Sequence, residues 1–307
     1  MTPSVAEREF HIDSPNPSGL LGIEFIEYAT AAPEALGALL QAVGFEAVAR
    51  HRSRNTVLYR QGAMNLVVNG HAGHRGQATP VISALGLQVR DAAAAHGRAL
   101  ALGAWGVPSR VAVMELNIPA IHGAGSSCIY FIDRCGDPAR STPGRSHRPG
   151  ERGADTFSIW DVDFVPIAGA PTRPPAIEGL HFFGVVQYIG LDRMADWVDF
   201  YGVLFGFELL PEDTHFGILP RGRILRSPRG GFHLQLIEMS PDVGDPGHDE
   251  SLQRIAFGAP DVMAAVQALQ QRGARFVDRA ELAPGERGAL TEPQLGGVSF
   301  ELVRHAA

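Results

Sequence analysis

Two histidines in the second half of the chain have the side-chain chemistry of metal or ligand sites. His233 stands two residues before Gln235 in the apolar segment 232–237, and residues two apart in a strand project to the same face. His181 precedes a second apolar segment, 182–188. A neutral imidazole can bind a metal, whereas a histidine packed in an apolar strand serves only as a hydrogen-bonded core residue. The residues alone leave both roles open.

Two charged residues lie in further strand-like segments. Arg254 lies in segment 253–257, and Glu301 lies in segment 298–303 near the end of the chain. If both face the interior of one barrel, they can form a bidentate ion pair. Alternatively, Arg254 faces a ligand carboxylate, with Gln253 and Gln235 as orienting amides. A guanidinium offers only hydrogen-bond donors, so Arg254 itself cannot bind a metal.

Other familiar catalytic motifs are missing from the sequence. The remaining histidines have no mutual spacing that suggests a ligand set, and segment 123–127 lacks the pattern of a phosphate-binding loop. No nucleophile elbow is present, and Ser299 is interpreted as an ordinary alternating strand residue.

The elements that must position these residues begin with an amphipathic helix over 194–207. Its apolar residues recur three and four positions apart, which is typical of a one-sided helix: Met194, Trp197, Val198, Tyr201 and Phe205. The pattern ends at Gly206 and is followed by a strand-like run. The helix is therefore expected to cover one face of a sheet.

This unit occurs four times along the chain. The other helical patterns cover 33–45, 91–107 and 261–277, and each helix follows a strand-like run and precedes two or three more. Four such βαβββ modules, paired two and two, predict an α+β protein. Its antiparallel sheets should curl around cavities and be backed by helices.

Length and composition limit the functional classes. The chain has 307 residues, enough for two domains, and a formal net charge of −7 with 19% charged residues, which argues against unaided nucleic-acid binding. No apolar run approaches membrane-spanning length and residues 1–18 do not form a leader, so a cytoplasmic location without membrane contact is expected. The two cysteines, Cys128 and Cys135, do not suggest a disulfide framework.

Composition also suggests the boundaries of the halves. Residues 1–19 are interpreted as an N-terminal strap and 20–165 as the first domain, with a surface excursion over 136–155 that is rich in Gly, Pro, Arg and Ser. A proline-rich linker covers 166–177. Residues 178–307 form the second domain, which is expected to carry the pocket.

The N-terminal half resembles the 4-hydroxyphenylpyruvate dioxygenase family of the vicinal-oxygen-chelate superfamily. The matching segments run in order through nearly the whole half: 22–28, 50–55, 58–61, 114–121, 130–134 and 158–164. The second half follows the family pattern at 193–194, Trp197, 200–201, 204–207, 252–253, 255–257 and 297–301. The resemblance implies two open-barrel halves of the vicinal-oxygen-chelate fold.

The resemblance also implies an iron(II) site in the C-terminal half. Family members bind iron through two histidines and one glutamate, leaving positions for a 2-oxo acid and dioxygen, and they convert 4-hydroxyphenylpyruvate to homogentisate. Glu301 matches the glutamate. The two histidine positions hold Gly184 or Val185, and Arg254. Family members also commonly form dimers or tetramers.

These departures leave two hypotheses about function. In the first, the protein is a dioxygenase-like enzyme acting on an aromatic or 2-oxo acid, with iron(II) or another divalent metal held by a re-formed site of His181, His233 and Glu301. In the second, the protein binds a small aromatic or acidic molecule without a metal. Either the Arg254–Glu301 ion pair fills the iron position, or Arg254 faces the ligand together with Gln253, Gln235 and His233.

Overall fold

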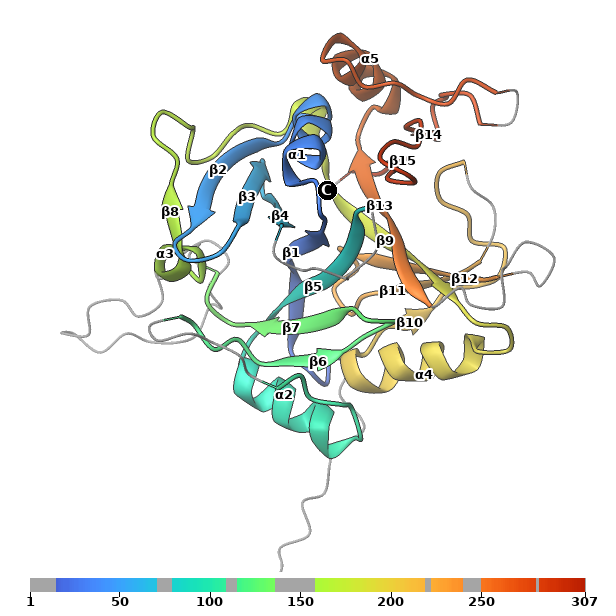
Figure 1. Ribbon diagram of the computed structural model, residues 1–307. Helices are drawn as coiled ribbons and strands as arrows, with labels where there is room; N and C mark the ends of the chain where they lie inside the picture. The colour runs from blue at the N-terminus through green and yellow to red at the C-terminus, as the bar shows by residue number, and fades with distance from the viewer. Residues whose placement is uncertain are drawn as a thin grey trace, which may run out of the picture.

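A computed structural model of the chain describes residues 15–70, 79–108, 115–135, 158–218, 222–239, 250–279 and 282–306. Within them, one large mixed sheet is covered by helices (Figure 1). The predicted α+β class is confirmed. Most of the predicted strap, and the whole predicted excursion over 136–155, lie outside the described residues.

The N-terminal half contains two units that each begin with a strand and a helix. The first consists of β1 (Leu20–Ala29), α1 (Pro33–Ala42), β2 (Glu46–His51), β3 (Thr56–Gln61) and β4 (Met64–Asn69). The second consists of β5 (Val81–Val89), α2 (Ala92–Ala101), β6 (Ala120–His122) and β7 (Cys128–Ile132). The half closes with α3 (Trp160–Asp163) and β8 (Phe164–Pro166).

The C-terminal half repeats this order after the short 3-10 turn η2 (Ile177–Gly179). Its first unit consists of β9 (His181–Ile189), α4 (Met194–Phe205), β10 (Glu208–Leu209), β11 (Arg223–Arg226) and β12 (His233–Glu238). Its second unit consists of β13 (Ser251–Ala259), α5 (Val262–Gln271), β14 (Gly288–Leu290) and β15 (Phe300–Arg304).

The strand pairing is the same in both halves. β4 pairs with β1 in parallel and β1 pairs with β5 in antiparallel fashion, just as β12 pairs with β9 and β9 with β13. The halves are joined where β13 pairs with β5 at Leu252 and Ile82, and Figure 1 shows these two strands beside each other at the centre of the molecule. Each half thereby forms its own curved part of the common sheet, with its own interior.

The helices pack against the outer faces of the sheet. Together, the helices and the sheet form one hydrophobic core that both halves share. In α4, Trp197, Tyr201 and Phe205 are buried, as the periodicity predicts, and the helix ends at Gly206 in the left-handed conformation at φ 76°. The ring of Phe205 stacks on Phe131 of β7 with centroids 5.9 Å apart. A helix of one half therefore covers a strand of the other.

The alternating pattern over 157–165 predicts one strand. Trp160–Asp163 instead form the short helix α3, and only the end of this segment, from Phe164, lies in a strand, β8. The Ser158 hydroxyl accepts a hydrogen bond from the Trp160 N–H, and the Asp161 carboxylate accepts one from the Ser158 N–H. These local side-chain contacts stabilise a helical turn over extended backbone.

Both cysteines carry free thiols. In the described segments, no helix combines the length and apolarity needed to cross a bilayer.

Candidate functional site

The register of the C-terminal sheet shows which residues stand where the family's iron site would be. Across β12, β9, β13 and β15, adjacent positions bring together His233, Gly184, Ala256 and Glu301, here called the central row. Arg254 lies two residues from Ala256, so it occupies the neighbouring row of the same face. Arg254 and Glu301, far apart in the sequence, therefore meet inside one barrel.

Arg254 and Glu301 form a buried ion pair. The Arg254 Nε lies 3.6 Å from the Glu301 Oε2, and the two side chains are only 12% and 4% exposed. The Ile218 N–H also donates to the carboxylate. The sequence suggests a bidentate pair, whereas the contact found here joins the Nε atom to one carboxylate oxygen at ion-pair distance. The side chain at the second histidine position is a donor-only cation.

Gly184 cannot be replaced by a metal ligand without moving the backbone. A Cβ atom at this position would overlap the carbonyl oxygen of His233 on the neighbouring strand β12. The other candidate position, Val185, is buried in the core shared with the helices. Neither position directs a side chain with metal-binding atoms toward Glu301.

The proposed replacement ligands are engaged elsewhere. The His233 ring stacks on Phe183 with centroids 4.4 Å apart, and its Nδ1 lies 3.3 Å from the Phe183 carbonyl oxygen. The His181 Nε2 is hydrogen-bonded to the Nδ1 of His305 at 3.0 Å.

In the sheet register, His181 of β9 pairs with Gly258 of β13, and Gly258 pairs with Val303 of β15. Val303 lies two residues from Glu301, so His181 is not in the row of residues that contains Glu301. A metal site of His181, His233 and Glu301 is therefore not assembled. Within the described ranges, no group of three His, Cys, Asp or Glu side chains is placed to hold a metal ion.

The two glutamines differ in position. Gln235 borders the small interior space of the C-terminal barrel. Gln253 precedes Arg254 on β13, where the register with β9 is irregular, and its side chain is exposed and donates to Ser251 at 2.7 Å. The expectation that Gln253 orients a ligand beside Arg254 is therefore wrong.

The C-terminal barrel is filled by its own chain. Its cavity measures about 20 Å³, room for roughly one water molecule. Phe216 packs on both Phe183 and His233, with ring centroids 5.0 Å apart in each pair. Gly217, at φ 67°, lies so close to the Glu301 carboxylate that a Cβ atom would overlap Oε1. The expected C-terminal pocket is closed because this segment packs into it.

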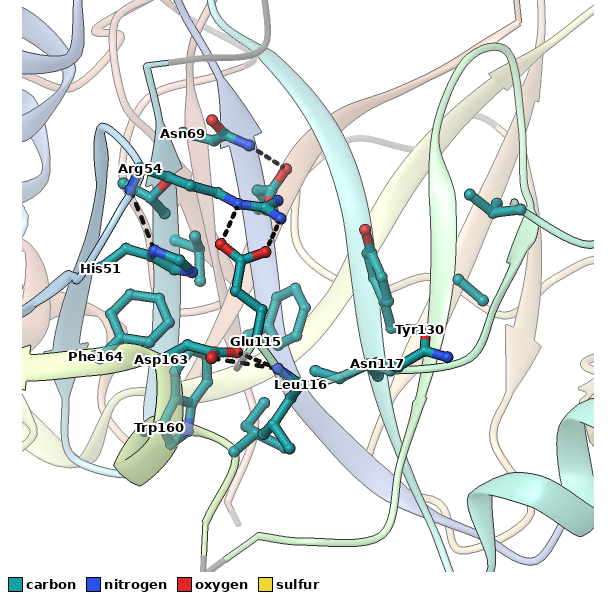
Figure 2. Close-up of a pocket in the computed structure, with 18 of the residues that line it drawn as sticks. His51, Arg54, Asn69, Glu115, Leu116, Asn117, Tyr130, Trp160, Asp163 and Phe164 are labelled. Atoms are coloured by element: carbon teal, nitrogen blue, oxygen red, sulfur yellow. Dashed lines mark hydrogen bonds and ion pairs between the residues drawn. The ribbon is translucent and has the colours of Figure 1, made fainter. Parts of the chain in front are cut away.

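A much larger cavity, about 460 Å³, lies in the N-terminal barrel. Its lining comes from strands β1, β2, β3, β4, β6, β7 and β8, from α3, from Arg54 in the β2–β3 connection and from segments 107–108 and 115–118 (Figure 2). Sequence reasoning missed this site. The signal was present, because lining residues Glu27, His51, Arg54, Tyr130 and Asp163 all fall in segments that resemble the dioxygenase family.

Charged groups inside the N-terminal cavity are held by an ion pair and by hydrogen bonds. Arg54 forms an ion pair with Glu115, and the Ser53 hydroxyl donates to the same carboxylate at 2.7 Å. Asp163 accepts a hydrogen bond from the Leu116 N–H at 3.3 Å (Figure 2).

On β1, Glu27 accepts hydrogen bonds from Ser83 at 2.8 Å and Asn69 at 3.3 Å. Burial raises the pKa of Glu27, although these two hydrogen bonds act to lower it.

Two buried groups in the C-terminal barrel respond to pH in opposite directions. Burial raises the pKa of Glu301 from 4.5 to about 7, against the attraction of Arg254. Its contribution to stability is therefore full below pH 4.5 and is lost as the pH rises to about 7. Burial lowers the pKa of His233 from 6.5 to about 4, so its contribution is lost as the pH falls through that range. Between about pH 4.5 and pH 6.5 the two contributions therefore oppose each other.

The variant Glu301→Gln should separate these contributions. Relative to the wild type, its free energy of unfolding should rise by on the order of 3 kcal/mol between about pH 4.5 and pH 7, because glutamine keeps the neutral form at every pH. Urea denaturation at a series of pH values measures this difference. Glu286→Gln is the matched control, since the Glu286 side chain is 85% exposed and should show no such trend. A pH-independent difference for Glu301→Gln would contradict the raised pKa.

Comparison with known proteins agrees with the residue-level resemblance. Residues 14–165 match the family model "Hydroxyphenylpyruvate dioxygenase, HPPD, N-terminal", and residues 181–302 match "Glyoxalase/Bleomycin resistance protein/Dioxygenase superfamily". The chain is 32% identical over 283 residues to 4-hydroxyphenylpyruvate dioxygenase of Pseudomonas sp. (strain P.J. 874), which covers 85% of this chain and 72% of that protein.

A second relative is a longer protein. The chain is 32% identical over 304 residues to 3-dehydroshikimate dehydratase of Pseudomonas aeruginosa, covering 90% of this chain but only 43% of that protein.

Two solved structures share the fold. A xylose isomerase-like TIM barrel/4-hydroxyphenylpyruvate dioxygenase fusion protein superposes with a TM-score of 0.70 at 24% identity, over 96% of this chain and 51% of that one. A 4-hydroxymandelate synthase variant from Streptomyces coelicolor gives 0.65 at 18% identity, over 93% of each chain. Together with the matched residues, these findings show that the chain belongs to the 4-hydroxyphenylpyruvate dioxygenase family of the vicinal-oxygen-chelate superfamily.

Proposed function

We propose that the protein is a small-molecule-binding member of this family that does not hold iron at the C-terminal position. The observation that carries the proposal is the buried Arg254–Glu301 ion pair. An iron(II) ion bound by the family's two-histidine, one-carboxylate pattern needs three ligands on one side. Here one carboxylate remains, and it is neutralised by a guanidinium that would repel the metal.

The residues around Glu301 do not fit the metal that the family uses. Gly184 is required by the close approach of β9 and β12, and the His233 ring packs against the rings of Phe183 and Phe216. A bound iron ion would need Arg254 to move out of the barrel and two new ligands to move in. The dioxygenase-like hypothesis therefore has the weaker support from this site.

The available space favours binding in the N-terminal half. An aromatic or 2-oxo acid is too large for the C-terminal space of about 20 Å³, and Arg254 is already paired with a carboxylate of the protein. The N-terminal cavity of about 460 Å³ lies within the roughly 300–1,000 Å³ typical of small-molecule sites. The filled C-terminal barrel and the open N-terminal barrel both support this proposal, in which a small molecule binds without metal chemistry in the C-terminal half.

Metal analysis tests the proposal. The purified protein is incubated anaerobically with iron(II), desalted and analysed for metal content. Wild type and Glu301→Ala should both retain well below one iron per chain, because the wild-type site lacks two of its three ligands. Glu286→Ala serves as the exposed-carboxylate control. Retention of one iron per chain by the wild type and the control, with loss in Glu301→Ala, would overturn the proposal.

A further inference from the structure

The N-terminal cavity lies at the centre of its barrel. The equivalent position in the C-terminal barrel is the filled space around Glu301, where the family's iron would bind. The row across β4, β1, β5 and β7 that corresponds to the central row consists of Val67, Glu27, Ala84 and Cys128. Glu27 thus takes the position of Gly184, at the centre of the interior face. The repeated register places this cavity at the centre of the barrel rather than at its surface.

The length of one connection explains why this barrel is open. In the C-terminal half, the connection between β10 and β11 covers residues 210–222 and includes Phe216 and Gly217, which fill the interior. The corresponding connection between β2 and β3 covers only residues 52–55. It is too short to reach the interior as a plug, and its Arg54 side chain instead lines the cavity.

One wall of the cavity is a continuous series of aromatic rings. Neighbouring centroids lie 5.9 Å apart between Tyr130 and Phe25, 5.6 Å between Phe25 and Trp160, and 5.2 Å between Trp160 and Phe164. The His51 ring continues the series 5.2 Å from Phe164. Such a wall offers stacking and edge contacts to a flat ring. The cavity is about three times the size of the roughly 150 Å³ space that accommodates benzene.

The polar groups facing this wall favour hydrogen-bond donors over anions. Among the described lining residues, the carboxylates Glu27, Glu115 and Asp163 outnumber the guanidinium of Arg54. That guanidinium is already paired with Glu115. A ligand carboxylate would therefore meet like charge without a free cationic partner among these residues, whereas an amine or hydroxyl could donate to Glu27.

His51 and Tyr130 add two further groups for a ligand hydroxyl. The His51 Nδ1 accepts from the backbone N–H groups of Ser53 at 3.2 Å and Arg54 at 3.3 Å. The ring proton is therefore assigned to Nε2, which can donate to a ligand. The Tyr130 hydroxyl has no hydrogen-bond partner within the residues that the structure describes, and its ring lines the cavity opposite His51 (Figure 2).

We propose that the N-terminal cavity binds a compact aromatic molecule whose polar group donates hydrogen bonds and carries no negative charge, such as a phenolic amine or a neutral phenol. The ring stacks on the aromatic wall, and the amine or hydroxyl donates to Glu27. This inference rests on the proposed function, because it gives the binding protein its site and its ligand class. It also separates this chain from the anionic substrate of its dioxygenase relatives.

Three probes with one ring skeleton test the charge preference by calorimetry. Tyramine is cationic, tyrosol is neutral and 4-hydroxyphenylacetate is anionic, with closely similar size. Tyramine and tyrosol should bind with one site per chain, and the anion should bind at least about tenfold more weakly, since a hydrogen bond to a charged group contributes about 1.5–3 kcal/mol. Equal or tighter binding of the anion would overturn the proposed ligand class.

Matched variants locate the site. Glu27→Gln, a nearly isosteric change, should weaken tyramine binding about tenfold or more and tyrosol binding much less. Tyr130→Phe should weaken both probes while retaining the ring wall. Glu34→Gln, an exposed substitution in the same half, should change neither. Circular dichroism establishes that each variant is folded, and unchanged binding in both Glu27→Gln and Tyr130→Phe would place the probes elsewhere and overturn the proposal.

Metal content, measured on the same samples, separates this inference from the proposed function. Metal-free protein that binds neither tyramine nor tyrosol at millimolar concentration overturns the cavity proposal and leaves the closed iron position intact. Stoichiometric iron that depends on Glu301 overturns the proposed function, whatever the probes do.

Discussion

Arg254→Met is expected to lower the free energy of unfolding by about 3–5 kcal/mol at about pH 8.5, because it leaves the Glu301 charge buried without a partner. Below the raised pKa of Glu301 the carboxyl is protonated, so at about pH 5 the same substitution should cost less than about 1 kcal/mol. Urea denaturation at the two pH values measures both effects. The loss at high pH should thus be several times the loss at low pH.

The double variant Arg254→Met/Glu301→Gln is the internal control for this prediction. Removing both charges leaves no uncompensated buried ion, and such replacements are often neutral or stabilising. The double variant should recover most of the stability lost in Arg254→Met at high pH. If Arg254→Met is as stable as the wild type at high pH, the ion pair does not stabilise the barrel and Glu301 is accommodated without it.

Gly184→His, the substitution that would restore a family ligand type, is expected to reduce stability by about 3 kcal/mol or more, at the upper end of overpacking effects. The new side chain must displace the backbone of β12 at His233. Denaturant unfolding measures the loss. The variant should also fail to retain iron after anaerobic loading, because Arg254 remains beside Glu301.

Two alanine substitutions give a matched comparison for Gly184→His. Gly184→Ala should destabilise by about 1–3 kcal/mol through the same overlap. Gly97→Ala should instead stabilise by about 0.5–1 kcal/mol, because Gly97 lies on the exposed face of α2 with open space around its Cβ position. Equal effects at the two glycines would show that the strand contact at Gly184 is not tight.

The larger cavity lies in the opposite half from the one that the resemblance implies. The family resemblance places the pocket in the C-terminal half, but there the β10–β11 connection places Phe216 and Gly217 against Glu301. In the N-terminal half the equivalent connection is short, and the interior remains open. A difference in loop length between two repeats therefore accompanies the difference between the open and the filled interior.

The amino-acid sequence by itself determined the repeated units, the α+β class and the identity of the residues at the iron position. Helical periodicity, strand alternation and glycine ends are local properties, so helices such as α4 could be predicted from neighbouring residues. The donor-only chemistry of Arg254 is likewise fixed by residue type, and the resemblance alone placed Arg254 where a histidine is expected.

Only the tertiary structure decided where the side chains point and which interior is filled. His181 contacts His305 and not Glu301, the Gln253 side chain is exposed, and residues 160–163 form a helix. These outcomes depend on strand register, on local hydrogen bonds and on packing between residues distant in sequence. A cavity is the space that such packing leaves empty, and no local pattern encodes it.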